Sequence, residues 1–349
     1  MKLPVPIAVV LLIAGLALGA APPATPVTQP APPATLPARA ETAIDLALLN
    51  LERHQHADGH FQSDPKLAVT ALTLTSYIAC GHAPDLGRHG ATVRRAIDYL
   101  VKSAPDDGYF GKVDGSRMYG QGIVVTALCE AYGLEHDAAR RAAMRAVLVK
   151  ALKVILDAQA VKKDPAHAGG WRYEPTSADS DLSVTAWNAI ALRAARDIGL
   201  DVPASAVDGA VAYVARCHRP ESHGFAYQPG AEPSIAMTAA GMISLSLLAG
   251  ADRPEIASGA KFLREHPMTD ATRFPYYTLY HASQAAHRAG GETWTTISRA
   301  AQERLLRTQL PSGAWPQSTS PEEPGEIYAT AMAVLTLSVP NAVLPLYQR

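Results

Sequence analysis

Two acidic residues stand just ahead of an apolar run in the middle of the chain, in segment 179–192. Asp179 and Asp181 precede Leu182, and the residues that follow have the apolar spacing of a helix. A carboxyl group there can cap the helix by accepting hydrogen bonds from its first free N–H groups. It can also act as a general acid where burial keeps it protonated. Asp181 and Asp179 are therefore candidate catalytic residues, and capping by Asp181 or Ser183 is the structural alternative.

The other side chains that could bind a metal or take part in catalysis form weaker patterns. Three histidines lie close together: His54, His56 and His60. They fall where a helix is expected to pass into a loop, so we interpret them as solvated polar residues rather than as metal ligands. The chain has no Gly-rich phosphate loop and no nucleophile elbow. We therefore expect neither a metal nor a cofactor.

The cysteines form no metal-binding or redox motif. The chain has three of them: Cys80, Cys129 and Cys217. Three cysteines cannot all pair within one chain, and none belongs to a CxxC sequence. Buried thiols are the interpretation favoured here, while one disulfide stays open for an exported protein.

The N-terminal segment has the pattern of an export signal. Lys2 precedes an apolar run from about residue 7 to residue 18, and small residues follow it. The run is short for a membrane span, so residues 1–21 are predicted to be a signal peptide, with cleavage or retention left open. Residues 22–40 are rich in Pro, Ala and Thr and predict an extended linker. We expect a periplasmic or secreted protein, with no transmembrane domain after cleavage and a folded domain over 41–349.

Composition narrows the class of partner. Charged residues make up 18% of the 349 residues, and the formal net charge is −1. The basic residues are scattered, so there is no positive surface of the kind that binds nucleic acid or an anionic membrane.

Internal repetition is the strongest signal in the sequence. Short apolar segments carry a Thr-Ala pair roughly every 50 to 60 residues, and each follows a more charged amphipathic segment. The threonines are Thr70, Thr126, Thr185, Thr238 and Thr330, and a sixth copy is expected around His281. The charged segments predict outer helices and the apolar ones inner helices. Six such pairs without a strand pattern predict an all-α protein, either a closed ring or an open solenoid.

A glycine followed by an aromatic residue separates the two helices of most repeats. Five repeats have this feature: Gly59 to Phe61, Gly108 to Phe110, Gly169 to Trp171, Gly224 to Phe225, and Gly313 to Trp315. The glycine is expected to end the outer helix, and the aromatic side chain to fill the junction between the two layers.

These motifs resemble those of a known family. The sequence QLPSGAW, from Gln309 to Trp315, fits the Gln-x-x-x-Gly-x-Trp repeat of squalene and oxidosqualene cyclases, and Gln55 to Phe61 is a near copy. The chain resembles the prenyltransferase/squalene-oxidase repeat superfamily, in particular its small exported members, over residues 41–349. The resemblance implies an (α/α)6 toroid of six helix-pair repeats, and it implies an activity much less firmly because one fold hosts many.

The chemistries of that superfamily are only partly matched. Its class II terpene cyclases use the middle acid of an Asp-x-Asp-Asp motif; Asp179 and Asp181 match two positions, but Leu182 stands in the fourth. The zinc-binding Asp-x-Cys motif of the protein prenyltransferases and the Gly-Cys-Gly-Glu-Gln loop of thioester proteins are both missing. Aromatic residues make up 6% of the chain, which is thin for a cyclase lining.

The favoured hypothesis is therefore a toroid that binds an apolar, isoprenoid-like or lipid-like ligand, or a protein partner, in a central cavity. The residues expected to line it are Trp171, Arg172, Tyr173, Trp187, Tyr276, Tyr277 and Tyr280. Arg172 is also expected to pair with Asp179 or Asp181. The alternative is a class II cyclase-like enzyme with Asp181 as its general acid, and a purely structural envelope scaffold is a third possibility.

Overall fold

The computed structural model describes residues 38–61, 64–341 and 343–344. The chain divides into a unit of Met1–Pro32, which lies outside the described residues, and a unit of Pro33–Arg349. The expected signal peptide and nearly all of the expected linker also lie outside them. Within the described part, no helix has both the length and the apolar character needed to cross a bilayer.

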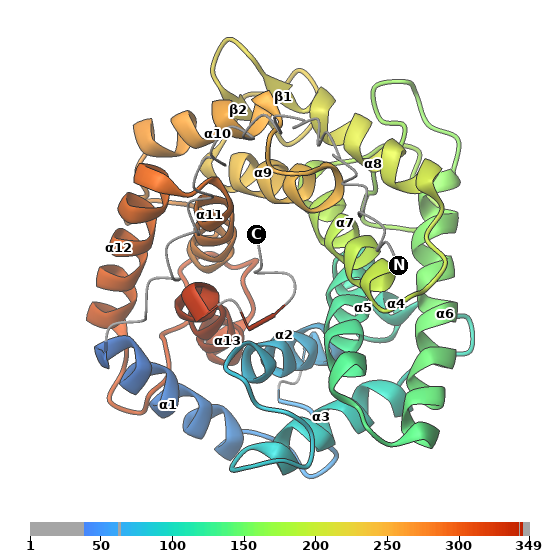
Figure 1. The fold of residues 1–349 in the computed structure, drawn as a ribbon, viewed down its shortest axis with the longest axis vertical. Coiled ribbons are helices and arrows are strands. Elements are labelled where there is room, and N and C mark those ends of the chain that lie inside the picture. Colours follow the sequence, from blue (N-terminus) through green and yellow to red (C-terminus); the bar gives the residue numbers. More distant parts are fainter. Residues whose placement is uncertain (1–37, 62–63, 342, 345–349) are drawn as a thin grey trace, which may run out of the picture. The chain divides into compact units, whose positions relative to one another are not determined.

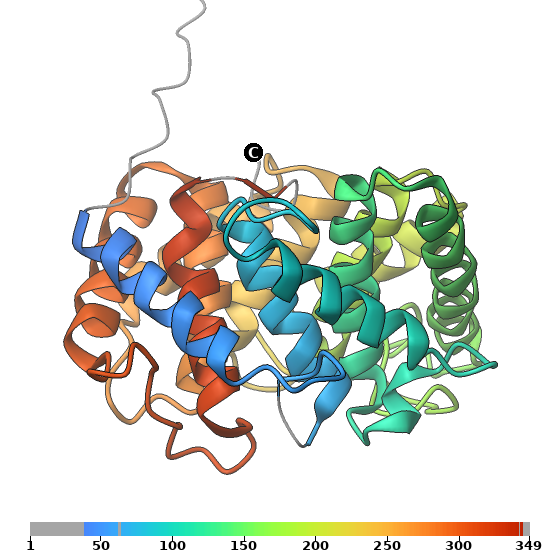
Figure 2. The same cartoon turned by 90° about the horizontal axis from the view of Figure 1, so that it is seen from below.

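The second unit is a ring of helices in two layers (Figure 1). The outer layer consists of α1 (Ala38–Arg53), α3 (Gly90–Lys102), α6 (Ala138–Ala160), α8 (Ala204–Arg216), α10 (Pro254–Glu265) and α12 (Gly291–Thr308). The inner layer consists of α2 (Lys66–Ala79), α5 (Arg117–Leu134), α7 (Leu182–Asp197), α9 (Ile235–Ala249), α11 (Pro275–Ala289) and α13 (Gly325–Ser338). Seen from the side, the helices run between the two faces of the ring (Figure 2). The predicted (α/α)6 toroid is confirmed.

A few short elements join the helices. They are α4 (Phe110–Val113), the 3-10 turn η1 (Val339–Asn341), and an antiparallel pair of strands, β1 (His218–Arg219) and β2 (Gly224–Phe225). The prediction of no strands was wrong for this hairpin, because two-residue strands are too short to show an alternating pattern. Helix α1 also begins at Ala38, three residues before the expected start at Glu41, since Ala40 is already buried in the core.

Sequence pattern explains the two layers. In α9 every residue from Ala236 to Leu248 is buried, as expected of a helix covered on all sides. In α6 the buried residues recur mostly three or four apart, and arginines and lysines stand among the exposed residues of the same helix. Burial of inner helices therefore supplies the core, and the outer helices supply the solvated surface.

The Thr-Ala threonines position the aromatic residues. Thr185 Oγ1 accepts a hydrogen bond from the backbone N–H of Trp171 at 3.0 Å, and Thr330 Oγ1 accepts one from Trp315 at 3.0 Å. Thr70 and Thr238 do the same for Phe61 and Phe225. This pairing fixes each aromatic residue against its own inner helix.

Thr126 does not have this role, and its alignment with the other threonines was wrong. Its hydroxyl donates to Gly122 O within α5, while Gln121 Oε1 accepts from the N–H of Phe110 at 2.8 Å. A glutamine amide oxygen can replace a threonine hydroxyl here, and an alignment by residue type misses the exchange.

The ring is closed. Helix α13 packs against both α2 and α1, so the last repeat contacts the first. The large apolar residues of α13 are buried, among them Ile327, Met332, Leu335 and Leu337. An open solenoid would leave that face of α13 in water.

Candidate functional site

The predicted acid, Asp181, lies at the face of the ring where the inner helices begin, which we call the mouth. Its side chain has 0% exposure. Asp181 Oδ1 accepts hydrogen bonds from the backbone N–H of Val184 at 3.0 Å and from the Ser183 hydroxyl at 2.6 Å. These are the contacts of an N-cap, so Asp181 caps α7 whatever else it does.

Arg172 lies against the other carboxyl oxygen. Its Nη1 is 3.4 Å from Asp181 Oδ2, and its Nε is 3.4 Å from Asp179 Oδ2. Burial raises the pKa of Asp181, and the hydrogen bonds from Ser183 and Val184 and the charge of Arg172 oppose that shift. A proton on Oδ2 would face a guanidinium group, which favours the ionised carboxylate. Arg172 was expected to pair with one aspartate or the other, and it contacts both.

Tyrosines surround this ion pair. Tyr119 Oη lies 2.5 Å from Ser183 Oγ, and Tyr173 Oη lies 2.6 Å from Tyr227 Oη. The guanidinium carbon of Arg172 is 4.7 Å from the ring centre of Tyr173 and 5.5 Å from that of Tyr227. The mouth thus holds its cation between aromatic rings and carboxylates.

Three tyrosines from different elements lie close enough to Asp181 for its charge to affect their pKa values. Burial first, and then the charge of Asp181, raise the pKa of Tyr119, Tyr227 and Tyr277 above its ordinary value. These tyrosines come from α5, from the loop before α9, and from α11. Each therefore keeps its proton at physiological pH and can donate a hydrogen bond.

Aromatic side chains of α7 and α11 meet behind the mouth. The rings of Trp187 and Tyr280 stack with centroids 6.1 Å apart, and His281 meets Trp187 edge-on at 5.0 Å. Tyr277 stacks on His281 at 4.0 Å. Trp187, Tyr277 and Tyr280, all expected at the cavity, are brought together.

Two polar atoms in this cluster are buried without a hydrogen-bond partner among the described residues, Tyr277 Oη and His281 Nε2. His281 Nδ1 lies 2.9 Å from the carbonyl oxygen of Tyr277, which can only accept, so Nδ1 carries the proton. Burial lowers the pKa of His281 to about 4. The imidazole is therefore neutral, and Nε2 presents an unprotonated lone pair.

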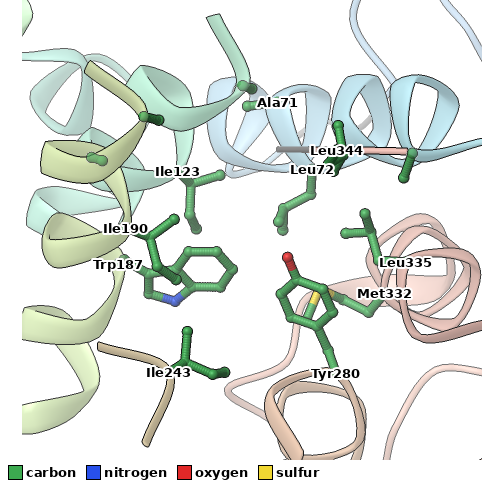
Figure 3. Packing of buried hydrophobic residues seen from close by; sticks show 14 of the residues in the cluster. Ala71, Leu72, Ile123, Trp187, Ile190, Ile243, Tyr280, Met332, Leu335 and Leu344 are labelled. Carbon is green, nitrogen blue, oxygen red and sulfur yellow. The ribbon is translucent and has the colours of Figure 1, made fainter. Parts of the chain in front are cut away.

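The centre of the ring is occupied by apolar side chains of the chain itself (Figure 3). Leu72, Ile123, Trp187, Tyr280 and Leu335 point toward one another there, and each is at most 8% exposed. Leu344, which follows η1, belongs to the same buried cluster. A polyprenyl chain could enter the centre only by displacing such contacts.

The structure does not gather all seven expected cavity residues around one space. Trp171 lies between the layers, and its indole N–H donates to Ile155 O of α6 at 2.7 Å. The Tyr276 hydroxyl donates to Pro316 O at 2.6 Å. Arg172 and Tyr173 belong to the mouth, whereas Trp187, Tyr277 and Tyr280 belong to the aromatic cluster behind it.

Sequence reasoning missed Tyr119, Tyr227 and a second buried carboxyl group, Glu323. Glu323 Oε1 accepts the backbone N–H of Tyr277 at 2.8 Å and so caps α11 from the loop between α12 and α13. Its Oε2 is buried with no hydrogen-bond partner in the described part of the chain. Burial raises the pKa of Glu323. The Glu322-Glu323 pair ahead of α13 was the available signal, because it resembles the acids ahead of α7.

His54 and His56 are exposed, as expected, but His60 is buried, so the expectation of a solvated side chain was wrong for it. His60 Nδ1 lies 2.6 Å from Asp58 Oδ1, and the rings of His56 and His60 stack at 4.0 Å. No group of three or more His, Cys, Asp or Glu side chains within 38–61, 64–341 and 343–344 is arranged to hold a metal ion. The thiols of Cys80, Cys129 and Cys217 are unpaired.

Comparison with known proteins establishes the fold. No protein-family model matches the chain, and no curated protein matches it. Among solved structures, an inactive variant of an alpha-1,6-mannanase of Salegentibacter in complex with alpha-1,6-mannotriose is 12% identical, with a TM-score of 0.62 over 87% of this chain and 99% of that one.

A type II terpene cyclase from Scytonema is also similar. It is 15% identical, with a TM-score of 0.56 over 88% of this chain and 99% of that one. A variant of that cyclase in complex with geranylgeranyl dihydroxybenzoate gives a TM-score of 0.57 at 15% identity over 88% of this chain and 98% of that one. The chain has the α/α-toroid fold of these cyclase structures and of the mannanase.

Proposed function

We propose that this toroid is a binding protein for a neutral, largely apolar ligand that carries a hydroxyl group. One observation carries the proposal: Tyr277 Oη and His281 Nε2 are both buried without a partner among the described residues, on two rings that stack at 4.0 Å and that both meet Trp187 in edge contacts. An unpaired buried polar group costs about 1–3 kcal/mol, so a group that satisfies both atoms is favoured there.

The chemistry of the two atoms defines the ligand. Neutral His281 offers an acceptor at Nε2, and protonated Tyr277 offers a donor. A hydroxyl group donates to the first and accepts from the second, whereas an ionised carboxylate can only accept. The apolar side chains at the ring centre would contact the body of such a ligand.

Similar folds support this proposal. The mannanase and cyclase structures are named as complexes with a sugar and with a prenylated dihydroxybenzoate, and both of those ligands carry hydroxyl groups. The favoured sequence hypothesis, an apolar ligand in the central cavity, is thereby refined to a ligand held between the mouth and the ring centre. A protein partner remains the alternative occupant.

Calorimetric titration with farnesol and with farnesyl diphosphate tests the proposal. Farnesol is expected to bind and the diphosphate to bind more weakly, because neutral His281 provides no positive charge. Tyr277→Phe and His281→Leu are expected to weaken farnesol binding. Tyr276→Phe is the matched control, since that hydroxyl already donates to Pro316 O. Equal affinity of all variants, or no binding by the unaltered protein, would overturn the proposal.

A second candidate is acid catalysis by Asp181, with Asp179 as its companion. Burial raises the pKa of Asp181, which favours a protonated acid. Its cap contacts and Arg172 favour the carboxylate instead. Formation of a cyclised product from squalene or a shorter isoprenoid by the unaltered protein, lost in Asp181→Asn, would decide for catalysis.

We also propose export to the periplasm or the medium, which rests on the pattern of residues 1–21 alone. N-terminal sequencing of the protein recovered after expression of the full chain tests it. A new N-terminus near residue 21 supports cleavage, an intact N-terminus in the exported fraction supports a retained anchor, and protein confined to the cytoplasm rejects export.

A further inference from the structure

Neighbouring outer helices meet over an inner helix at six places around the ring, which we call seams. Five of the seams are filled by one aromatic side chain that is at most 2% exposed. These side chains are Phe61, Phe110, Trp171, Phe225 and Trp315. Each belongs to the glycine-aromatic motif of its repeat.

The seam between α6 and α8 shows how the filling works. Trp171 is held by Thr185 of α7 and by Ile155 O of α6. Gln159 Nε2 donates to Gly169 O at 2.8 Å and to Ala206 O of α8 at 2.8 Å, which ties the two outer helices together. The aromatic residue and the glutamine thus act as one unit.

The sixth seam, between α10 and α12 over α11, lacks this unit. Its loop, from His266 to Phe274, has no glycine, and its one aromatic residue, Phe274, stands next to the first residue of α11 and is only half-buried. Thr278, the threonine of α11, donates to Arg273 O rather than holding an aromatic residue. Met268 stands in place of the aromatic residue and is only partly buried.

A cavity of about 420 Å³ lies at this seam. Its apolar lining includes Leu263 of α10, Leu279 and Ala282 of α11, Ile297 and Ala301 of α12, and Met268. This volume falls within the range of small-molecule sites, about 300–1,000 Å³. The apolar space left by the missing aromatic residue is therefore large enough for a ligand.

Three arginines line the same cavity: Arg264, Arg304 and Arg307. Arg304 Nη1 donates to Thr269 O at 3.1 Å and lies 3.3 Å from Asp270 Oδ1, a carboxylate whose side chain is 92% exposed. Asp270 and Glu303 are the acidic residues of the lining, and Arg264 Nε lies 3.8 Å from Oε2 of Glu292, another exposed carboxylate. An exposed carboxylate is easily exchanged for another anion, since exposed ion pairs contribute little.

We propose that this seam is a second binding site, for a small amphiphile with an apolar body and one anionic head group, such as a fatty acid. The apolar body takes the space that an aromatic side chain fills at the other seams, and the head group lies at the arginines. This site is on the outer wall of the ring and is separate from the mouth, so its test is independent of the test of the mouth.

Calorimetric titration of the full chain with dodecanoate, dodecanol and dodecyltrimethylammonium tests the proposal. Dodecanoate is expected to bind about tenfold more tightly than dodecanol, and the cationic detergent more weakly than either. Arg307→Ala is expected to weaken dodecanoate binding and to leave dodecanol binding unchanged. Equal affinity for the three amphiphiles, or no binding at all, would overturn the assignment.

Two substitutions locate the site. Met268→Trp supplies the missing aromatic side chain and is expected to weaken dodecanoate binding at least about tenfold while raising the melting temperature. Ala300→Phe, at an exposed position of the lining, is expected to obstruct the cavity without disturbing the core. Val149→Trp, on the exposed surface of α6, is the matched control and should bind as the unaltered protein does. Unchanged binding in Ala300→Phe and in folded Met268→Trp would place the amphiphile elsewhere and reject the site.

Discussion

Gln309 and Ala43, which are 266 positions apart in the sequence, are joined by a hydrogen bond of 2.8 Å from the glutamine Nε2 to the alanine carbonyl oxygen. The same Nε2 donates to Gly313 O at 2.9 Å. Gln55 Nε2 makes the equivalent pair of contacts, to Gly59 O and to Thr92 O of α3. The bond that closes the ring is therefore the same bond that joins neighbouring repeats within it.

Because Gln309 and Gln55 make equivalent contacts, removing either side chain should lower the free energy of unfolding by a similar amount. Gln309→Ala leaves two carbonyl groups without their donor and is expected to lower the free energy of unfolding by about 1–3 kcal/mol. Gln55→Ala removes the matching bonds between α1 and α3 and should cost a similar amount. Urea unfolding followed by circular dichroism gives both values. A loss for Gln55→Ala alone would mean that the ring opens at α12 and α1 in solution.

The threonine contacts give a second prediction. Thr330→Val keeps the shape of the side chain but leaves the N–H of Trp315 without an acceptor, so it is expected to destabilise the fold by about 1–3 kcal/mol. Thr126→Val is the matched control. Its hydroxyl donates only within α5, because Gln121 accepts from Phe110, and its loss should cost much less. Similar losses at both positions would contradict the assigned role.

Contacts that repeat around the ring could be predicted from the sequence, and contacts that occur once could not. Other repeats have threonine, glycine and an aromatic residue at the positions of Thr185, Gly169 and Trp171. This recurrence predicts the helix pairs, the two layers and the ring. The mouth follows no such pattern. Tyr119 meets Ser183 only because α5 and α7 are neighbours in the ring.

The residues that cap the inner helices also follow no repeating pattern, so the sequence did not predict them. Asp64 and Glu232 stand ahead of α2 and α9 in the sequence, but α2 is capped by Asp114 from the following repeat, and α9 by Ser234. Side chains that reach across loops are placed by the loop conformation, which has no period. The packed ring centre was missed because the sequence does not show how far Trp187 and Tyr280 extend toward each other.

Acid should weaken the contact of α3, α5 and α6. Burial raises the pKa of Glu135, but hydrogen bonds from Arg140, the Asp137 N–H and Arg94 outweigh it and hold the pKa at about 2. A lowered carboxyl pKa gives stability that is present above the usual value of 4.5 and is lost as the pH falls toward about 2. Glu135→Gln should therefore destabilise the protein at pH 7 and have much less effect near pH 2, as measured by urea unfolding at each pH.

Glu130 of α5 should make the protein less stable as the pH rises, which is the opposite of the effect of Glu135. Burial and then the charge of Asp197 raise its pKa from 4.5 to about 7, against the effect of Arg193. The folded chain thus binds more protons than the unfolded chain between these values, and stability falls as the pH rises through that window. Glu130→Gln should flatten the fall, whereas Glu41→Gln, at an exposed position of α1, should not. An unchanged pH profile in Glu130→Gln would show that this carboxyl group is ionised throughout.

Two substitutions of Asp181 distinguish a capping role from a catalytic role, because the two roles predict different effects for Asn and for Ala. As a cap, Asp181→Asn should be mild, because the amide oxygen can still accept from Ser183 and Val184, while Asp181→Ala should cost about 1 kcal/mol. If Asp181 is the acid, Asn in its place cannot deliver a proton, so Asp181→Asn should abolish turnover of an isoprenoid while the melting temperature stays nearly unchanged.

Asp179→Asn is the companion variant. Asp179 contacts the same Arg172, so this substitution is expected to reduce activity only in part. Product formation by the unaltered protein and the two Asn variants, with their melting temperatures, decides between the roles. If no isoprenoid yields product and Asp181→Asn binds farnesol as tightly as the unaltered protein, the carboxylate is a cap held by Arg172.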